Sequence, residues 1–245
     1  MARFYAPDLK HVSSIEGPEA FHAFAVLRLK IGDFCTLFDG LGTEQKARIL
    51  NIDKDSFEYE PIITQASPKP PCSLHLSQAI PKGKAMDLIL QKTTEVGVSS
   101  IYPLLSNRSV IELAVNKQKP KTEKWVQTSV EACKQCGQNW LPQIHPYSDI
   151  ETYLGVTSSL KGLKLIASLQ PDAKSLTKVI SQAKSEGLIK DIYYLVGPEG
   201  DFTPSEMGEA RSCGYIPVSL GPNILRSETA AIFLTSILFY ELNFA

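Results

Sequence analysis

Val196-Gly-Pro-Glu-Gly-Asp-Phe202 carries the clearest fold signal in this chain, and a second stretch, Ser219-Leu-Gly-Pro-Asn-Ile-Leu-Arg-Ser-Glu-Thr-Ala-Ala231, follows the same pattern. Each comes after a short β-branched or apolar run, at 192–196 and 216–220, turns on a Gly-Pro pair and then becomes helical in pattern. Two such turns in succession predict two neighbouring parallel strands that end at one edge of a sheet. Open α/β folds bind their ligands at that edge.

The two stretches lack the glycine spacing of a dinucleotide-binding or Walker loop, and neither contains Gly-Lys-Ser/Thr. Glycine lets the backbone approach a ligand where a side chain would clash. For the first stretch alone, an ordinary strand–helix connection explains the sequence equally well, because turn glycines are common. The matching second stretch favours a ligand held by main-chain hydrogen bonds, such as an adenosine whose adenine is enclosed by leucines. The candidate binding residues are Leu195, Gly197, Pro198, Glu199, Gly200, Leu220, Gly221, Ile224 and Leu225.

The composition fits a soluble protein with buried cores. The 245 residues, 43% of them apolar, suffice for one large domain or two modest ones. Met1-Ala-Arg-Phe-Tyr-Ala-Pro7 lacks the apolar segment of a secretion signal. The most apolar stretch, 230–242, is too short to span a bilayer and contains Glu241. Five cysteines at no disulfide-like spacing agree with a reducing compartment, so we expect a cytoplasmic protein.

The net charge of −1 is unevenly distributed along the chain. Residues 73–140 hold 9 basic and 5 acidic side chains, whereas 1–72 hold 8 and 10, and 141–245 hold 8 and 11. A local basic surface contacts phosphates even when the overall charge is not basic. Composition alone favours a simpler explanation, a solvated helix face in the middle of the chain.

The N-terminal part is rich in strand and turn signals. Strands are predicted at 34–38, 46–52 and 56–60, and a helix at 17–29. The density of Asp-Gly and Gly-Asp turns predicts a small β-barrel. Ala66-Ser-Pro-Lys-Pro-Pro71 is a linker, because three prolines in four positions sustain neither a helix nor a ladder. We therefore place one domain at 1–70 and another at 73–245.

Strand and helix patterns alternate after the linker. Strands are predicted at 73–80, 101–105, 163–169, 192–196 and 216–220, and helices at 84–96, 121–136, 176–186 and 203–214. Thr203-Pro-Ser-Glu206 is a strong helix start, with Thr as the N-cap, Pro in the first turn and Glu three residues after the cap. Such alternation predicts βαβ units and a largely parallel sheet, hence an α/β fold.

Further motifs occur in a fixed order along nearly the whole chain. They are Val26-Leu-Arg-Leu-Lys-Ile-Gly-Asp33, Phe38-Asp-Gly-Leu-Gly42, Lys82-Gly-Lys-Ala-Met-Asp87, Gln91-Lys-Thr-Thr-Glu-Val-Gly-Val98 and Glu131-Ala-Cys-Lys-Gln-Cys-Gly137. With the two Gly-Pro stretches, they make the chain resemble the RsmE family of SPOUT-class methyltransferases. That family methylates N3 of a uridine in small-subunit (16S) ribosomal RNA with S-adenosyl-L-methionine. The chain departs from the family pattern at Phe21-His22, Gln138, Gly200-Asp201 and Asn223.

The resemblance implies a PUA-like, RNA-binding β-barrel followed by a SPOUT methyltransferase domain with a C-terminal trefoil knot. It adds a third pocket loop, Ser168-Leu-Gln-Pro171, in which Ser168 and Leu169 contact the cofactor. It also implies a homodimer in which one subunit completes the other's pocket, and the apolar helix at 230–242 is long enough to bury against a partner. The implied substrate is small-subunit ribosomal RNA or the assembled small subunit.

Methylation of uridine N3 requires loss of the N3 proton, and the remaining charge spreads over the flanking carbonyl oxygens. An arginine stabilises such charge, and a carboxylate or an ordered water accepts the proton. Arg226 directly follows Ile224-Leu225 and is our candidate for the electrostatic role, although a salt-bridge role stays open. Glu199 and Glu228 are candidates for the base or for binding the methionine amino group. An acidic residue in the first turn of a helix is expected at 228 in any case.

Cys133 and Cys136 form a Cys-x-x-Cys within a helical pattern, with no second ligand pair, so we expect no metal there. The four histidines are scattered and indicate no catalytic triad.

Basic residues are the candidates for RNA contact. They are Arg3, Arg28, Lys82, Lys84 and Arg108. Each alone is explained as a solvated surface charge, but together they indicate a phosphate track, which positions RNA without reading its sequence.

Two other functions stay open on these residues. One is a SPOUT methyltransferase that modifies a ribose 2′-hydroxyl of transfer RNA. The other is a non-catalytic RNA-binding adapter whose glycine loops are structural.

Overall fold

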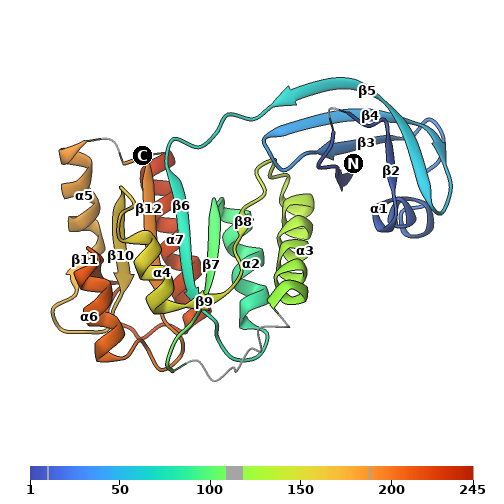
Figure 1. Ribbon diagram of the computed structural model, residues 1–245. Helices are drawn as coiled ribbons and strands as arrows, with labels where there is room; N and C mark the ends of the chain where they lie inside the picture. Colours follow the sequence, from blue (N-terminus) through green and yellow to red (C-terminus); the bar gives the residue numbers. More distant parts are fainter. Residues whose placement is uncertain (10, 109–117, 188, 245) are drawn as a thin grey trace. The chain divides into compact units, whose positions relative to one another are not determined.

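The computed structural model describes residues 1–9, 11–108, 118–187 and 189–244, and the chain forms two compact units. The first unit consists of Met1–Lys69 with Val130–Leu141, and the second of Pro70–Ser129 with Pro142–Ala245. Figure 1 labels most of the helices and strands of both units.

The first unit is built on a five-stranded sheet. Its strands are β1 (Ala2–Tyr5), β2 (Ser14–Glu16), β3 (Phe34–Phe38), β4 (Thr43–Ile52) and β5 (Ser56–Ala66), in the order β1-β3-β4-β5-β2. β1 runs parallel to β3, and the other neighbours pair antiparallel. Phe4, Leu37 and Phe57 are fully buried in its core. The three predicted strands are confirmed, whereas β1 and β2, of 4 and 3 residues, are too short to show an alternating pattern.

The helix predicted at 17–29 is shorter and changes type. It consists of α1 (Pro18–Phe21) followed by a π-helical turn, η1 (His22–Val26). Arg28 follows with a left-handed φ of 54°, and its side chain is exposed. Apolar side chains on this element are also exposed, among them Phe21. Helical periodicity therefore located the element but not its geometry.

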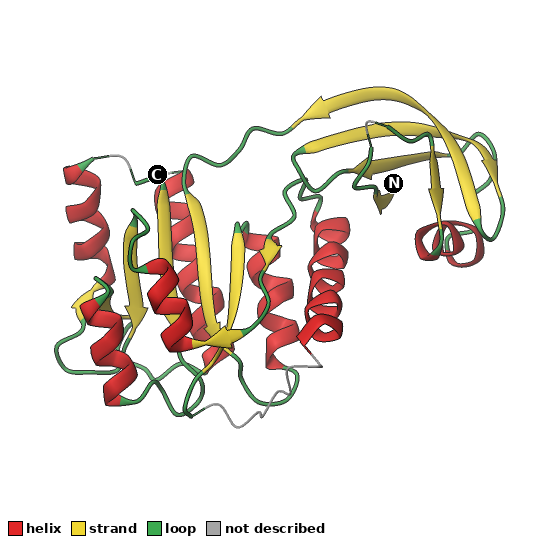
Figure 2. Cartoon of the chain, viewed as in Figure 1, coloured by secondary structure: helices red, strands yellow, loops and turns green. Residues whose placement is uncertain are grey.

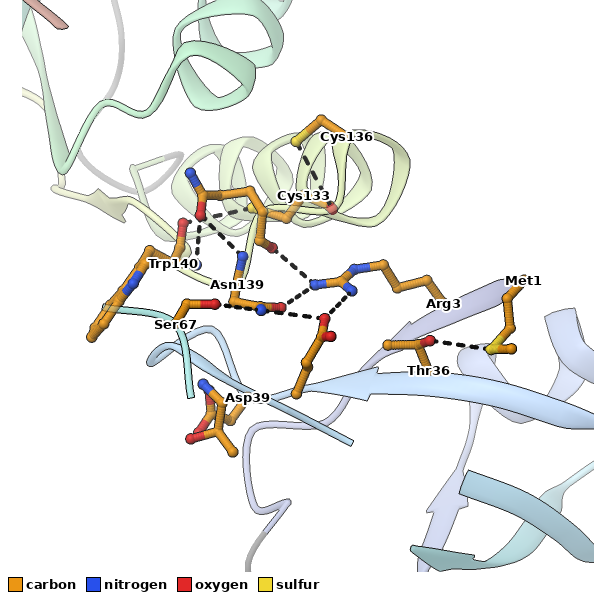
Figure 3. Close-up of polar contacts among 12 residues, drawn as sticks. Met1, Arg3, Thr36, Asp39, Ser67, Cys133, Cys136, Asn139 and Trp140 are labelled. Atoms are coloured by element: carbon orange, nitrogen blue, oxygen red, sulfur yellow. Dashed lines mark hydrogen bonds and ion pairs between the residues drawn. The ribbon is translucent and has the colours of Figure 1, made fainter. Parts of the chain in front are cut away.

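Arg3 explains why Val130–Leu141 belongs to the first unit (Figure 3). Its guanidinium pairs with Glu44 at 2.9 Å, donates to the Gln138 carbonyl at 3.2 Å and donates to Asn139 Oδ1. The Arg3 side chain is only 11% exposed. Arg3 is thus a half-buried cation with partners inside the first unit, and its contact with RNA stays a prediction.

Trp140 gives the same segment an apolar attachment. Gly42 has a φ of 97°, and a Cβ at this position would overlap the Trp140 ring. Trp140 Nε1 donates to the Pro68 carbonyl at 3.1 Å, and Lys134 pairs with Glu19 at 2.9 Å. Glycine at 42 is therefore required both by the backbone conformation and by the space that Trp140 occupies.

The second unit contains an eight-stranded sheet whose described pairs are all parallel (Figure 2). Its strands are β6 (Ser73–Ala79), β7 (Ser100–Leu105), β8 (Gln143–Ile144), β9 (Ser148–Asp149), β10 (Leu163–Ala167), β11 (Lys174–Ser175), β12 (Asp191–Val196) and β13 (Ile216–Ser219). The order is β11-β13-β10-β12-β6-β7-β8, and β9 also pairs with β7. The predicted α/β fold with a parallel sheet is confirmed. The prediction that the strands at 192–196 and 216–220 are neighbours is wrong, because β10 lies between them.

Two apolar clusters cover the two faces of this sheet. Successive residues of β12 alternate between them: Tyr194 enters one cluster, whereas Tyr193 and Leu195 enter the other. This alternation is the period of two expected of a strand buried on both faces. The helices are α2 (Ala85–Val96), α3 (Gln118–Cys136, whose last turns belong to the first unit), α4 (Ile150–Thr157), α5 (Leu176–Glu186), α6 (Pro204–Ser212) and α7 (Ser227–Asn243). α7, red in Figure 1, packs against α2 and β6.

α4 is missing from the sequence prediction. Its sequence is rich in β-branched residues and contains Gly155, all of which have weak helix propensity. Its start is fixed instead by the N-cap Asp149, which accepts from the Thr152 amide at 2.7 Å. Within the described ranges, no helix combines the length and apolarity needed to cross a membrane.

Candidate functional site

A cavity of about 450 Å³ lies where three parallel strands of the second unit end. Its walls are the loop after β12 (first loop, 197–202), the loop after β13 (second loop, 220–226) and the loop after β10 (third loop, 168–171). Because β10 lies between β12 and β13 and all three run parallel, their carboxyl ends meet at one edge. The third loop therefore lies between the first and second loops.

Most of the predicted cofactor residues line this cavity. They are Ser168, Leu169, Gly197, Pro198, Glu199, Leu220, Gly221, Ile224 and Leu225, and the predicted catalytic Arg226 lines it as well. Leu195 does not: it is fully buried in the cluster that contains Tyr193, while the next residue, Val196, lines the cavity. Gly200 is not in the lining either, and its carbonyl accepts from the Arg108 guanidinium at 2.6 Å.

Gln78 and Ser227 join the first loop to the start of α7. Ser227 Oγ donates to the Gly197 carbonyl at 2.6 Å and accepts from Gln78 Nε2 at 2.9 Å. Gln78 lies on β6, is fully buried and also donates to the Ala79 carbonyl at 2.8 Å. Neither Gln78 nor Ser227 is predicted from the sequence, because the two residues lie 149 positions apart and neither one indicates its partner locally.

The capping box predicted at Thr203-Pro-Ser-Glu206 is confirmed. Thr203 N–H donates to Glu206 Oε2 at 2.7 Å, and the Glu206 amide donates to Thr203 Oγ1 at 3.3 Å. Glu206 is 2% exposed, and its Oε1 accepts from the Asn107 amide at 2.8 Å. This buried carboxylate therefore fixes the start of α6 directly after the first loop.

Two carboxylates of the first loop line the cavity. Glu199 Oε1 accepts from the Lys82 backbone N–H at 3.0 Å, so Lys82 contributes its main chain here. Asp201, which sequence analysis did not select, accepts on Oδ1 from the Phe202 amide at 2.8 Å. Burial raises the pKa of the Asp201 carboxyl, while this hydrogen bond and the charge of Arg108 lower it.

The second loop is open towards the cavity. Gly221 has a φ of 127°, and a Cβ built there would meet no atom within 4 Å. Ile224 is 80% exposed. The loop thus presents main-chain groups and apolar side chains to any molecule in the cavity.

Arg226 ends the second loop at the N-cap of α7, with an extended backbone and no capping hydrogen bond from its side chain. No hydrogen bond or ion pair links its guanidinium to another described residue, so the alternative of a salt-bridge role has no partner there. Glu228 lies in the first turn of α7, outside the cavity lining. Lys82, Lys84 and Arg108 are exposed. Across the parts of the chain that the structure covers, no group of three or more His, Cys, Asp or Glu is arranged to hold a metal ion.

Comparison with known proteins places this cavity in a family. A family model described as an RNA methyltransferase domain matches residues 68–239, and one described as an RNA methyltransferase PUA domain matches residues 15–62. The chain belongs to this RNA methyltransferase family. Its first unit therefore carries a PUA-like domain, and its second unit carries the RNA methyltransferase domain.

Relatives in this RNA methyltransferase family confirm the resemblance to RsmE proteins. Ribosomal RNA small subunit methyltransferase E of Bacillus subtilis is 28% identical and aligns over 93% of this chain and 90% of its own length. The protein of the same name from Rickettsia conorii is 30% identical over 84% of this chain and 80% of its own length.

Solved structures of family members share the whole fold. A Legionella pneumophila methyltransferase in complex with the bound cofactor SAM has a TM-score of 0.86 and 29% identity, with 97% of this chain and 96% of that one covered. Ribosomal RNA small subunit methyltransferase E of Neisseria gonorrhoeae, bound to S-adenosyl methionine, has a TM-score of 0.84 at the same identity and coverage.

Proposed function

We propose that this protein transfers a methyl group from S-adenosyl-L-methionine to N3 of a uridine in small-subunit ribosomal RNA. The observation that carries the proposal is the cavity at the ends of β10, β12 and β13, in a chain 29% identical to relatives that bind S-adenosylmethionine. The names of the relatives favour ribosomal over transfer RNA. A ligand cavity of this size also argues against a purely structural adapter.

The cavity suits this cofactor in size and chemistry. Its volume of about 450 Å³ lies in the range of small-molecule pockets. Leu220, Ile224 and Leu225 offer apolar contact to an adenine ring, and the backbone around Gly221 offers donors and acceptors for its edge. The cofactor supplies an electrophilic methyl group on a sulfonium. The protein supplies the orientation, and its part in the reaction concerns the uridine.

Arg226 has the electrostatic role in this proposal. Loss of the N3 proton leaves a negative charge shared by N3 and the two flanking carbonyl oxygens, and a planar guanidinium donates to such oxygens in a fork. Because its side chain has no partner among the described residues, Arg226 is available to the substrate. Glu199, held by the Lys82 amide, accepts the N3 proton directly or through a water.

RNA contact extends the proposal to surface cations of each unit. Arg28 is exposed on the first unit, and Lys82, Lys84 and Arg108 are exposed on the second. Arg3 differs from these surface cations, because its guanidinium pairs with Glu44 and donates to Asn139. These cations contact phosphates and position the RNA. The boundaries that go with this division are 1–70 for RNA binding and 73–245 for methyl transfer.

A homodimer and a C-terminal trefoil knot complete the proposal. α7 buries Leu234 and Leu238 in its own unit but exposes Phe233 and Tyr240, so one side of it is available to a second subunit. A two-fold pair is the commonest symmetric assembly. Sedimentation that shows a stable, active monomer at micromolar concentration would exclude this arrangement.

Nucleoside mass spectrometry on small-subunit ribosomal RNA tests the function. A strain that lacks the gene is expected to lose N3-methyluridine, and the wild-type chain restores it. The Arg226→Ala chain, expressed at the same level, does not restore it. Unchanged N3-methyluridine in the deletion strain, or loss of a 2′-O-methyl nucleoside instead, contradicts the proposal.

A further inference from the structure

Asp201 has a backbone conformation that aspartate rarely adopts. Its φ is 59°, and among the described residues only Arg28 shares a positive φ without being glycine. The left-handed region is strained for residues with a Cβ, although Asp and Asn tolerate it better than others. Strain of this kind persists where the surroundings impose it, and it concentrates at functional sites. Of the two residues, Asp201 lines the cavity.

This conformation directs the Asp201 carboxylate over the start of the first loop. Oδ1 accepts from the Phe202 amide at 2.8 Å, and the same atom would lie 3.2 Å from a Cβ at Gly197. Glycine at 197 therefore leaves room for the carboxylate against the loop backbone. Both residues belong to the cavity lining, and Oδ1 lies beside the Gly197 backbone there.

No hydrogen bond or ion pair joins the Asp201 carboxylate to a cationic side chain among the described residues. The guanidinium of Arg108 lies near enough to lower the pKa of Asp201, yet its hydrogen bond goes to the Gly200 carbonyl at 2.6 Å. The other carboxylate in the lining, Glu199, already accepts the Lys82 amide. Burial of the Asp201 carboxyl disfavours its charged form and so raises its pKa. A cation that enters with the ligand stabilises the charged form.

The proposed cofactor carries such a cation, the α-ammonium of its methionine moiety. Resting on the proposed function, we infer that Asp201 binds this ammonium group at the wall formed by the first loop. An ammonium has three donors, and a charge-assisted hydrogen bond to a carboxylate is stronger than a neutral one. Oδ2 is available for it while Oδ1 keeps the Phe202 amide. The assignment also divides the lining charges: Asp201 holds the cofactor, and Glu199 and Arg226 serve the uridine.

Calorimetry with two adenosine ligands tests the inference on the full-length chain. S-adenosylhomocysteine has the ammonium, whereas 5′-methylthioadenosine lacks the amino-acid moiety. Asp201→Asn retains an oxygen for the Phe202 amide and tolerates the positive φ, so the loop keeps its shape. It is expected to weaken S-adenosylhomocysteine roughly tenfold or more and to leave methylthioadenosine within about twofold. Asp172→Asn, which removes an exposed carboxylate paired with Arg211 after the third loop, is the charge-matched control and leaves both affinities unchanged.

The outcomes separate the inference from the proposed function. A wild-type chain that binds neither ligand contradicts the proposed function itself. If the wild type binds both and Asp201→Asn weakens both equally, Asp201 only shapes the loop and the inference is wrong. An unchanged affinity for S-adenosylhomocysteine also overturns it. A loss of single-turnover rate alone, with the acid limb of its pH profile removed, would then identify Asp201 as a proton acceptor.

Discussion

The first and second loops of the cavity share a Gly-Pro pattern, yet the protein holds them in different ways. The first loop is tied at Gly197 by Ser227, at Glu199 by the Lys82 amide and at Gly200 by Arg108. At the second loop, the Ser219 hydroxyl donates to the Gly221 carbonyl and accepts from the Gly221 amide, and both of these hydrogen bonds are long, at 3.3 Å. The chain itself therefore holds the first loop at three points, whereas we expect the second loop to be ordered further by a ligand.

This difference predicts how substitutions divide between stability and activity. Loss of the Ser227 hydroxyl, which ties the first loop at Gly197, takes a hydrogen-bond partner from the buried Gln78 side chain, and this lowers the free energy of unfolding. A change in the second loop meets few protein atoms and acts on whatever occupies the cavity.

Gly221→Leu is expected to abolish cofactor binding while unfolding stays cooperative. No protein atom lies within 4 Å of the new Cβ, so the side chain extends into open space beside the cavity. The backbone strain at φ 127° is controlled for by Gly187→Leu, because Gly187 has a φ of 141° and an equally open surrounding at the end of α5. Calorimetry measures both variants. Undiminished affinity in Gly221→Leu would remove the second loop from the site.

Arg226→Ala is expected to slow methyl transfer by about two orders of magnitude or more, as the loss of an oxyanion donor does. Cofactor affinity is expected to change little, because in the proposed mechanism Arg226 acts on the charge that develops on the uridine. The helix keeps its start, since the Arg226 side chain makes no capping bond. Arg226→Lys recovers part of the rate, because a point charge does not reproduce a planar fork. Normal single-turnover methylation by the Ala variant would make Arg226 a structural residue.

Ser227→Ala is expected to lower the free energy of unfolding by about 1–3 kcal/mol. The substitution removes the hydrogen bond from the Ser227 hydroxyl to the Gly197 carbonyl and the one from Gln78 Nε2 to this hydroxyl. Ser219→Ala, at the end of β13 directly before the second loop, is the matched control, because its hydroxyl is more open, and its effect stays within about 0.5 kcal/mol. Urea unfolding measures both. Equal losses would show that the two loops are held alike.

The sequence predicts what is local in this molecule and fails where distant residues meet. The capping box at Thr203–Glu206 and the strand at 192–196 depend on neighbours in the chain, and both are confirmed. The expectation that Leu195 lines the pocket overlooks the alternation of β12, which turns the Leu195 side chain into the core. Arg3 looked like a surface cation because Glu44 and Asn139, its partners, are 41 and 136 residues away.

The position of the third loop and the role of Asp201 are likewise not indicated by the local sequence. Nothing within 163–171 indicates that β10 separates β12 from β13, since strand order depends on crossover connections rather than on local pattern. The importance of Asp201 rests on its φ of 59°, which residue identity does not reveal. The family resemblance supplied the third loop but gave no reason to select Asp201.

The smallest expected effect is a pH-dependent gain in stability from Asp201→Asn. Burial raises the pKa of the Asp201 carboxyl in the folded chain. Ionisation of this group therefore destabilises the ligand-free folded state relative to the unfolded state. A folded pKa above the unfolded one gives stability that is present below the unfolded pKa and lost as the pH rises through the folded pKa. Replacing the carboxyl with an amide removes that loss at neutral pH and changes nothing in acid.

Urea unfolding of wild type and Asp201→Asn, without ligand, at pH 7 and at about pH 3.5 measures this difference. The Asn variant is expected to be slightly more stable at neutral pH, by less than the Ser227→Ala difference, and equal to wild type in acid. Asp201→Gly removes both the charge and the strain of the positive φ, whereas Asp201→Asn removes the charge alone. The difference in stability between these two variants therefore reports the strain, which is independent of pH. A variant that gains stability at neutral pH while it loses S-adenosylhomocysteine affinity would show that the free first loop holds a carboxylate for its ligand rather than for its own fold. A loss of stability in Asp201→Asn at neutral pH would instead make the carboxylate a structural part of the loop.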